Sequence, residues 1–252
     1  MRSIKKRTEP SCVANLRREV EQGRSPGWNP QDCKEPMQKQ LVAEQEGLCA
    51  YCMNRIKPRG YRRVEGGAKP NGGMKIEHWI PRSDPSPAGS TGRTRGEENM
   101  YVWKNLLGVC GGETQSDAGW VQHCDDSRGN APLQVHPVAD EGIRPEAAFE
   151  FSSKTPDGVP DDAGPGIWLH ARQTAYEQDI QLLNLNAPTL ALARYQARQA
   201  IRTKLQLAEK RARSREVAKK ELLTATLPGP FGLPPFAPII EAYLREKLER
   251  WT

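Results

Sequence analysis

Four cysteines constrain the fold of this chain more than any other feature of its sequence. Cys49 and Cys52 form a Cys-x-x-Cys pair, and Cys110 and Cys124 follow at longer spacing. A Cys-x-x-Cys turn supplies two of the four ligands of a closed tetrahedral zinc site, and the other two can come from any segment that folds back onto it. The pattern therefore predicts one structural Zn²⁺ ion bound by all four cysteines.

Two alternatives to this ligand set stay open. His123 directly precedes Cys124 and could take its place at the metal, and the four thiols could instead be unrelated buried residues. Cys12 and Cys33 lack a comparable pairing, so we expect ordinary thiols at these two positions.

The chain has 252 residues, which is long enough to bury a substantial core in one or two domains. Its formal net charge is +6 and its sequence pI is about 9.0, which permits a polyanionic partner without specifying one. It contains no long apolar run, and its first residues lack the apolar core of a secretory signal. We therefore expect no membrane segment and a cytoplasmic location, where a disulfide framework is not expected.

Composition divides the chain into three regions. Residues 1–46 combine a basic N-terminal arm with a lead-in helix predicted over Glu35–Glu46. Residues 47–135 are rich in glycine and hold the candidates for chemistry. Residues 136–252 predict a hairpin followed by helices, so the fold class is α+β.

In the third region, residues 148–151 are predicted to pair with residues 158–159 as the hairpin. Asn186 then serves as the predicted N-cap of a long basic amphipathic helix, with Pro188 in its first turn. A Pro-Gly-Pro stretch ends that helix, and a terminal helix is predicted over Ile239–Trp251. The basic face of the long helix fits either nucleic-acid contact or an ordinary solvated surface.

Residues 75–81 predict a strand that ends at Pro81, and residues 84–92 predict a loop from their proline and glycine content. Neighbouring side chains of a strand point to opposite faces, so Glu77 and His78 face different sides unless the chain bends there. A single histidine beside a tryptophan is more often structural than catalytic, and the decision depends on the residues around it.

The motifs of the middle region form a set: Cys49-x-x-Cys52, Glu77-His78-x-x-Pro81, Trp103-Lys104-Asn105-Leu106-Leu107, and Cys110 through Cys124-Asp125-x-x-Arg128-Gly129-Asn130. This set resembles HNH endonucleases of the zinc-stapled type, and the similarity covers about residues 48–130. The resemblance implies a ββα-metal core, in which a two-stranded hairpin and a helix surround one divalent ion. The N-terminal arm and the C-terminal helical region would flank this core.

The resemblance also implies a role for individual residues. His78 would be the general base that activates water, Glu77 and Asp125 would bind the catalytic Mg²⁺ or Mn²⁺ ion, and Asn105 would hold the loop that presents the histidine. The chemistry is consistent, because hard cations prefer carboxylate oxygen and a neutral imidazole accepts a proton near pH 7. The planar guanidinium of Arg128 could in addition pair with a phosphate oxygen.

Looser runs extend over most of the chain: Met1–Pro10, Asn105–Gly112, His123–Asp125 and Ile180–Asn186. They resemble the nuclease subunit of Septu antiphage systems, a family that also supplies the nuclease of some retron systems. The resemblance implies a bacterial effector that cleaves nucleic acid under the control of an ABC-type ATPase partner. The sequence leaves open whether the substrate is DNA or RNA, and we expect DNA more than RNA. The chain itself lacks a Gly-x-x-x-x-Gly-Lys-Ser/Thr phosphate loop, so we expect such control to come from outside.

We expect that partner to contact the region from about Ile167 to Thr252, although apolar helix faces are more often internal packing than interface. Two other classes stay open. A stand-alone HNH restriction-type nuclease would use the same core without a partner. A non-catalytic zinc-binding module would need the four cysteines but would have no use for the acidic residues and the histidine between them.

Overall fold

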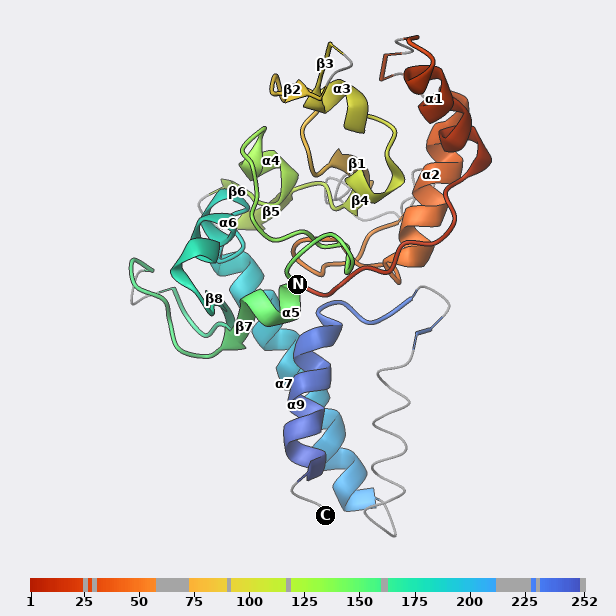
Figure 1. Cartoon of the computed structure of the whole chain (residues 1–252). Helices are drawn as coiled ribbons and strands as arrows, with labels where there is room; N and C mark the ends of the chain where they lie inside the picture. The colour runs from red at the N-terminus through yellow and green to blue at the C-terminus, as the bar shows by residue number, and fades with distance from the viewer. Residues whose placement is uncertain are drawn as a thin grey trace.

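The computed structural model of this chain describes residues 1–24, 27–28, 31–57, 73–89, 92–116, 119–159, 163–211, 228–229 and 232–249. Within these residues, short antiparallel strand pairs and helices follow one another along the chain, and each sheet has two strands. The architecture is therefore mixed α+β, as the sequence predicts (Figure 1). Among the described helices, none combines the length and the apolar character needed to cross a bilayer.

The central strand pair joins β1 (Lys75–His78) to β4 (Leu106–Val109). The two strands are antiparallel, with Lys75 opposite Val109 and His78 opposite Leu106. β1 ends before the predicted stop at Pro81, because the chain bends at Trp79 and donates the Trp79 N–H to the Asn105 carbonyl. This bend fixes where the predicted site residues of β1 can point.

Three short elements separate β1 from β4. β2 (Pro87–Ala88) pairs with β3 (Arg93–Thr94), and α3 (Arg95–Asn99) and the short helix η1 (Trp103–Asn105) follow. The predicted loop at residues 84–92 thus contains one short strand. Thr94 forms a capping box with Glu97 at the start of α3, which explains why the helix begins there.

A second hairpin follows β4. β5 (Glu113–Ser116) pairs with β6 (Gly119–Gln122), and α4 (Asp125–Arg128) begins directly after Cys124. The two antiparallel strands leave the central pair and return to it, so they account for the long interval between Cys110 and Cys124.

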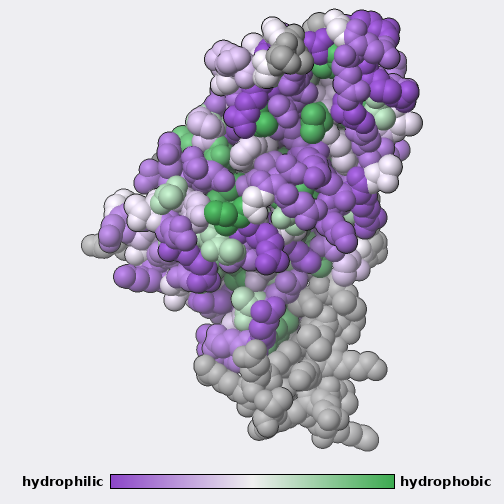
Figure 2. Space-filling model, in the orientation of Figure 1, coloured by the Kyte–Doolittle hydropathy of each residue, from purple (hydrophilic) through white to green (hydrophobic). Residues whose placement is uncertain are grey.

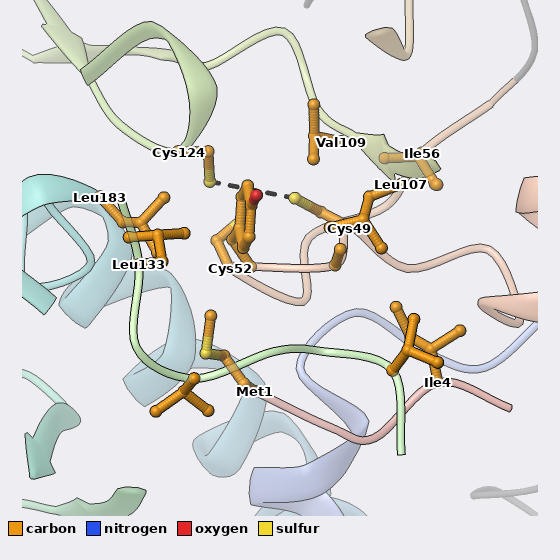
Figure 3. Packing of buried hydrophobic residues seen from close by; sticks show 14 of the residues in the cluster. Met1, Ile4, Cys49, Cys52, Ile56, Leu107, Val109, Cys124, Leu133 and Leu183 are labelled. Atoms are coloured by element: carbon orange, nitrogen blue, oxygen red, sulfur yellow. Dashed lines mark hydrogen bonds between the residues drawn. The ribbon is translucent and has the colours of Figure 1, made fainter. Parts of the chain in front are cut away.

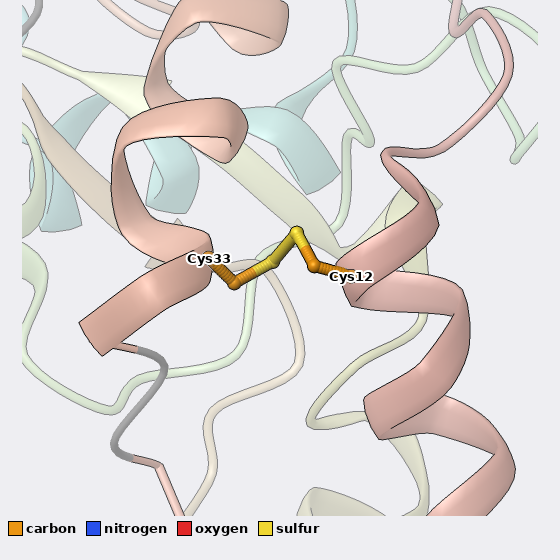
Figure 4. Close-up of a disulfide and its surroundings, with 2 residues drawn as sticks. All are labelled: Cys12 and Cys33. Carbon is orange, nitrogen blue, oxygen red and sulfur yellow. A yellow bond between two sulfur atoms is a disulfide. The ribbon is translucent and has the colours of Figure 1, made fainter.

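The first region folds as two helices, α1 (Ser11–Glu21) and α2 (Gln31–Glu44). α2 contains most of the predicted lead-in helix but begins earlier, and α1 has no counterpart among the predicted elements. A disulfide joins Cys12 of α1 to Cys33 of α2, with 5.7 Å between their Cα atoms (Figure 4). The prediction of ordinary thiols is therefore wrong for this pair, because the pairing depends on two helices packing side by side, which the sequence spacing does not reveal.

Part of the N-terminal arm packs into the core. Met1 and Ile4 are buried, and Ile4 forms a parallel bridge with Val138. Lys6 is also buried and pairs with the Glu44 carboxylate at 3.4 Å. Because full burial of a large apolar side chain contributes about 1.5–3 kcal/mol, the arm adds to the stability of the fold.

One hydrophobic cluster draws on all three compositional regions. It extends from Met1 in the arm through Leu107 in β4 to Leu190 in the C-terminal region. Figure 3 shows Met1, Leu107 and Leu183 within this cluster, together with Cys49 and Cys124. The divisions after residues 46 and 135 are therefore changes of composition within a shared core.

The third region begins with α5 (Pro145–Ala148) and β7 (Phe149–Ser152), which pairs with β8 (Trp168–Ala171). The predicted hairpin is correct in its first strand and wrong in its second. Gly158 adopts a positive φ of 82° in the connection, whereas Trp168 and Leu169 are buried, so the apolar β8 provides the pairing strand. The short helix η2 (Thr174–Tyr176) and α6 (Glu177–Leu182) follow.

The long helix α7 (Pro188–Arg211) begins at the predicted proline, and α9 (Ala237–Glu249) is the predicted terminal helix. Asn186 is not the N-cap, since its side-chain amide is bonded elsewhere: it accepts from the Leu169 N–H and donates to the Leu169 carbonyl, both at 2.8 Å. The predicted stop of α7 at residues 227–230 is described only at residues 228–229, and residues 212–227 before it lie outside the described residues.

Figure 1 shows α7 and α9 side by side, extending away from the other elements. Ile201 and Leu205 of α7 pack in one cluster with Ile240 and Leu244 of α9. These parts of the two apolar stripes therefore cover each other, whereas Leu192 and Leu207 of α7 stay exposed. On the face drawn in Figure 2, hydrophobic residues form small separate groups on a mostly hydrophilic surface.

Candidate metal centre and catalytic site

The four predicted zinc ligands converge in the structure. Their Sγ atoms all lie within 4.8 Å of one another. The Sγ atoms of Cys49 and Cys124 are 3.9 Å apart, and those of Cys52 and Cys110 are 3.7 Å apart. A tetrahedral site with Zn–S distances of about 2.3 Å has sulfur–sulfur edges of about 3.8 Å. The donor set therefore fits Zn²⁺.

The local backbone explains this convergence. The Cys49–Cys52 turn is followed by Met53 at a φ of 66°, and Cys124 has a φ of 58°, so both chain segments reverse sharply at the site. The Cys110 N–H also donates to Cys49 Sγ at 3.4 Å. Burial raises the pKa of the Cys124 thiol, and a bound cation would stabilise the thiolate form that burial opposes.

His123 lies beside the cysteine cluster. Its Nδ1 atom is 3.2 Å from Cys124 Sγ and 3.9 Å from Cys110 Sγ. The set of mutually close donor atoms nevertheless contains Cys124 and not His123. The geometry thus favours the four-cysteine set over the alternative in which His123 replaces Cys124, and it places the imidazole against the sulfur atoms from outside.

Glu77 and Asp125 form a carboxyl pair between β1 and α4. Burial, together with the hydrogen bond and the charge of Asp125, raises the pKa of Glu77 to about 9 and outweighs the attraction of Arg128. The side chains stay slightly accessible, at 12% for Glu77 and 25% for Asp125. Two neighbouring carboxyl groups offer a divalent cation two oxygen ligands, which is enough when water and phosphate complete the shell. This pair therefore fits a catalytic metal ion.

Lys75 is a third charged group at this pair that the sequence analysis did not single out. Its ammonium group forms an ion pair with Asp126 and lies 3.9 Å from Asp125 Oδ2. Strand alternation contains the signal for it, because Lys75 and Glu77 share one face of β1 and both face α4.

Arg128 is buried instead of facing solvent, where a phosphate could reach it. Its side chain has no solvent exposure, and its guanidinium donates to Glu77 Oε1 at 2.6 Å, to the Trp79 carbonyl at 2.5 Å and to the Tyr51 hydroxyl at 3.2 Å. It also donates to the Ala131 carbonyl at 2.7 Å. The predicted contact with a phosphate is therefore not supported, because the guanidinium already faces acceptors inside the protein.

His78 points away from the carboxyl pair. Its Nε2 atom lies 3.0 Å from the Met100 carbonyl, which can only accept, so Nε2 carries the proton and Nδ1 carries the lone pair. The imidazole is only 6% exposed, and the Trp28 ring meets it edge-on with 4.3 Å between ring centroids. Burial lowers the pKa of His78 to about 4, so the ring is neutral at pH 7.

Asn105 contacts the segment that follows His78. Its Oδ1 accepts from the Ile80 N–H at 2.6 Å, and its Nδ2 donates to the Ile80 carbonyl at 3.2 Å and to the Asn99 carbonyl at 2.9 Å. These three bonds link the end of β1 to the chain before β4. The side chain is thus positioned to hold the bend that follows the histidine.

The structure therefore gathers the predicted residues in two neighbouring groups, Glu77 with Asp125 and Arg128 on one side of β1, and His78 near Asn105 on the other. Sequence reasoning missed Tyr51, Trp28 and Lys75. Trp28 lies far from His78 in sequence and its position depends on how α1 and α2 pack, so no local signal identifies it.

A cavity among the described residues lies away from this site. It has a volume of about 460 Å³ and is lined by residues of the 154–159 segment, β8 and α6, and by Asn184 and Asn186, with none of the predicted site residues among them. No protein-family model matches the chain, and no curated protein or solved structure matches it. What the fold and site define is thus an α+β protein with a four-cysteine centre that fits zinc.

Proposed function

We propose that this chain is a metal-dependent endonuclease of the HNH type that hydrolyses phosphodiester bonds in nucleic acid, with DNA as the preferred substrate. The observation that carries the proposal is the Glu77–Asp125 carboxyl pair, because Glu77 precedes His78 directly at the end of β1 and Asp125 follows Cys124 of the centre that fits zinc. A pair of neighbouring carboxyl groups at this place favours a metal-dependent catalytic site over a zinc centre alone.

Each side chain has a defined task in this proposal. Glu77 and Asp125 would hold one Mg²⁺ or Mn²⁺ ion, which when bound neutralises charge on the phosphate and the leaving oxygen. His78 would take a proton from the attacking water at Nδ1, while the Met100 carbonyl keeps the proton on Nε2. Arg128 and Asn105 would orient Glu77 and the His78 bend without touching the substrate.

The burial of His78 favours one competing function, a non-catalytic zinc-binding module. In such a module the histidine would be a structural residue packed against Trp28. The same contacts between His78 and Trp28 would also occur in a nuclease that is held inactive. A measurement of nucleic-acid cleavage is therefore needed to distinguish a nuclease from a non-catalytic zinc-binding module.

The test is cleavage of supercoiled DNA, single-stranded DNA and RNA with Mg²⁺, Mn²⁺ or a chelator. His78→Ala should lower the rate by about 10²- to 10⁴-fold, the usual contribution of a general base. His170→Ala is the matched control, because His170 lies on β8 and should leave the rate unchanged. Equal rates in the two variants, or no metal-dependent cleavage of any substrate under activating conditions, would contradict the proposal.

We further propose that the nuclease acts with an ABC-type ATPase partner, as the Septu resemblance implies. Part of the apolar surface of α7 and α9 is used within the chain, since Ile201 and Leu205 pack with Ile240 and Leu244. A partner would therefore contact the outer, charged surface of the α7–α9 pair. Arg202 and Lys204 are exposed on that surface.

A further inference from the structure

The indole ring of Trp28 packs against the His78 imidazole. Trp28, between α1 and α2, contacts His78 edge-on and lies 5.3 Å from the Tyr101 ring, measured between centroids. The Arg82 guanidinium also contacts Trp28, with 5.6 Å between its Cζ atom and the centroid of the indole ring. Trp28 is half-buried whereas His78 is buried, so the indole forms the outer layer between the imidazole and solvent.

Polar contacts attach the same part of the chain to the segment between β1 and β4. The Tyr101 hydroxyl donates to the Gly27 carbonyl, next to Trp28. The Arg93 guanidinium donates to the Val20 carbonyl near the end of α1. These contacts are reversible and involve backbone carbonyls of the N-terminal region, so they hold Trp28 in place only while α1 and α2 keep their arrangement.

The Cys12–Cys33 disulfide fixes that arrangement. It joins the helices on either side of Trp28 across a sequence separation of 21 residues. α1 buries only Val13 and Val20 among its own side chains, so apolar packing alone anchors it weakly. Cys33 is buried but Cys12 is only partly buried, which leaves the Cys12 sulfur as the one that an attacking thiolate can reach.

We propose that Gly27–Trp28 is an autoinhibitory cover over His78 and that the Cys12–Cys33 disulfide is the redox-sensitive latch that holds it closed. A dithiol reductant opens the latch in two steps. One of its thiolates bonds to Cys12 sulfur and releases Cys33 as a thiol, and its second thiolate then displaces Cys12 as a thiol. The reductant ends as a disulfide, having supplied two electrons and two protons.

This proposal rests on the proposed function only in its consequence for cleavage. The cover itself can be measured without any nuclease assay, from the rate at which diethyl pyrocarbonate modifies each histidine, followed by peptide mass spectrometry. The variants are Trp28→Ala, the paired change Cys12→Ser/Cys33→Ala, and Trp120→Ala as a control at a tryptophan that is 43% exposed on β6.

Diethyl pyrocarbonate should modify His78 about tenfold faster or more in Trp28→Ala and in the paired cysteine variant than in the oxidised wild-type chain. The reason is that each change makes the open state, which is minor in the wild type, the dominant one. Trp120→Ala should match the wild type, and His170 should react equally in all four proteins. An unchanged His78 rate in Trp28→Ala overturns the cover. A fast rate in Trp28→Ala with a slow rate in the cysteine variant overturns the latch.

His123, which is 1% exposed, reports unfolding. If it also reacts faster in Trp28→Ala, Tyr101→Phe decides, because it removes only the hydroxyl that holds Gly27: faster modification of His78 supports the cover, and an unchanged rate overturns it. If the chain is a nuclease, the opened proteins should also cleave faster. If His78 becomes accessible in these variants but no cleavage occurs, the proposed nuclease function is contradicted, whereas the proposal that Gly27–Trp28 covers His78 still holds.

Discussion

At the scale of single residues, the side chains around Glu77 show how buried charge is managed. Arg128 has no exposed side-chain surface, and Glu77 is its acidic partner at 2.6 Å. The remaining donors of Arg128 go to the Trp79 and Ala131 carbonyls and the Tyr51 hydroxyl. This one side chain therefore connects the Cys-x-x-Cys turn, the end of β1 and α4.

Replacing Arg128 by Met should lower the free energy of unfolding by about 1–3 kcal/mol for each buried acceptor that loses its donor, among them the Trp79 and Ala131 carbonyls. Arg128→Lys keeps the charge but not the fork of donors, so it should fall between Met and the wild type. Urea denaturation gives the comparison. A phosphate-binding arginine would behave differently, because its loss would weaken substrate binding and leave stability unchanged.

The sequence contains the identities of the site residues but only part of their geometry. Strand alternation correctly separates His78 from Glu77, and the Cys-x-x-Cys motif correctly anticipates the cysteine cluster. The burial of Arg128 was not predictable, because an arginine at the end of a short helix looks the same in the sequence whether its guanidinium faces water or a buried carboxyl group. Trp28 was missed since its contact with His78 is a long-range one.

At the scale of elements, the β5–β6 hairpin and the four cysteines depend on each other. The hairpin connects Cys110 to Cys124, and the His123 N–H donates to the Gly112 carbonyl at its base. Gly112 has a φ of 75°, and a Cβ atom there would lie 2.6 Å from Asp126 Oδ2. The sequence predicted the metal centre but not the hairpin, because residues 113–122 have no strong strand pattern.

Removing the metal should unfold the elements that converge on it. Structural zinc contributes on the order of 10 kcal/mol to the folding of small metallo-domains, so the chain should contain about one tightly bound Zn²⁺. Cys49→Ser or Cys110→Ser should lose the zinc and a large part of the thermal stability. Elemental analysis and thermal melting followed by circular dichroism provide the two measurements.

Cys12→Ser is the matched control, because Cys12 belongs to the disulfide and not to the cluster. It should retain the full zinc content. A folded wild-type protein without zinc, or zinc loss that follows Cys12→Ser as readily as Cys49→Ser, would contradict the four-cysteine assignment.

At the scale of the whole molecule, one cluster of buried residues runs from Met1 to Leu190, while α7 and α9 add a separate cluster between themselves. The boundaries after residues 46 and 135 therefore mark changes in amino-acid composition, while the hydrophobic core continues across them. The α7–α9 pair extends from the rest of the described chain, with Ile201 and Leu205 of α7 covered by α9 (Figure 1). A partner that binds this pair would contact the surface that this packing leaves exposed, which includes Arg202 and Lys204.

We predict that an ABC-type ATPase co-expressed with this chain elutes with it in size-exclusion chromatography, and that Arg202→Glu/Lys204→Glu weakens the complex by about tenfold or more, since reversing exposed charges at an interface opposes association. Both side chains are exposed on α7, so the double variant should fold normally. Lys39→Glu, at an exposed lysine of α2, is the control and should bind as the wild type does.

Deleting α9 would be a poorer test, because it would uncover Ile201 and Leu205 and destabilise α7 itself. Separate elution of the two proteins would contradict the partnership, and equal binding by the double variant and the control would place the contact away from α7.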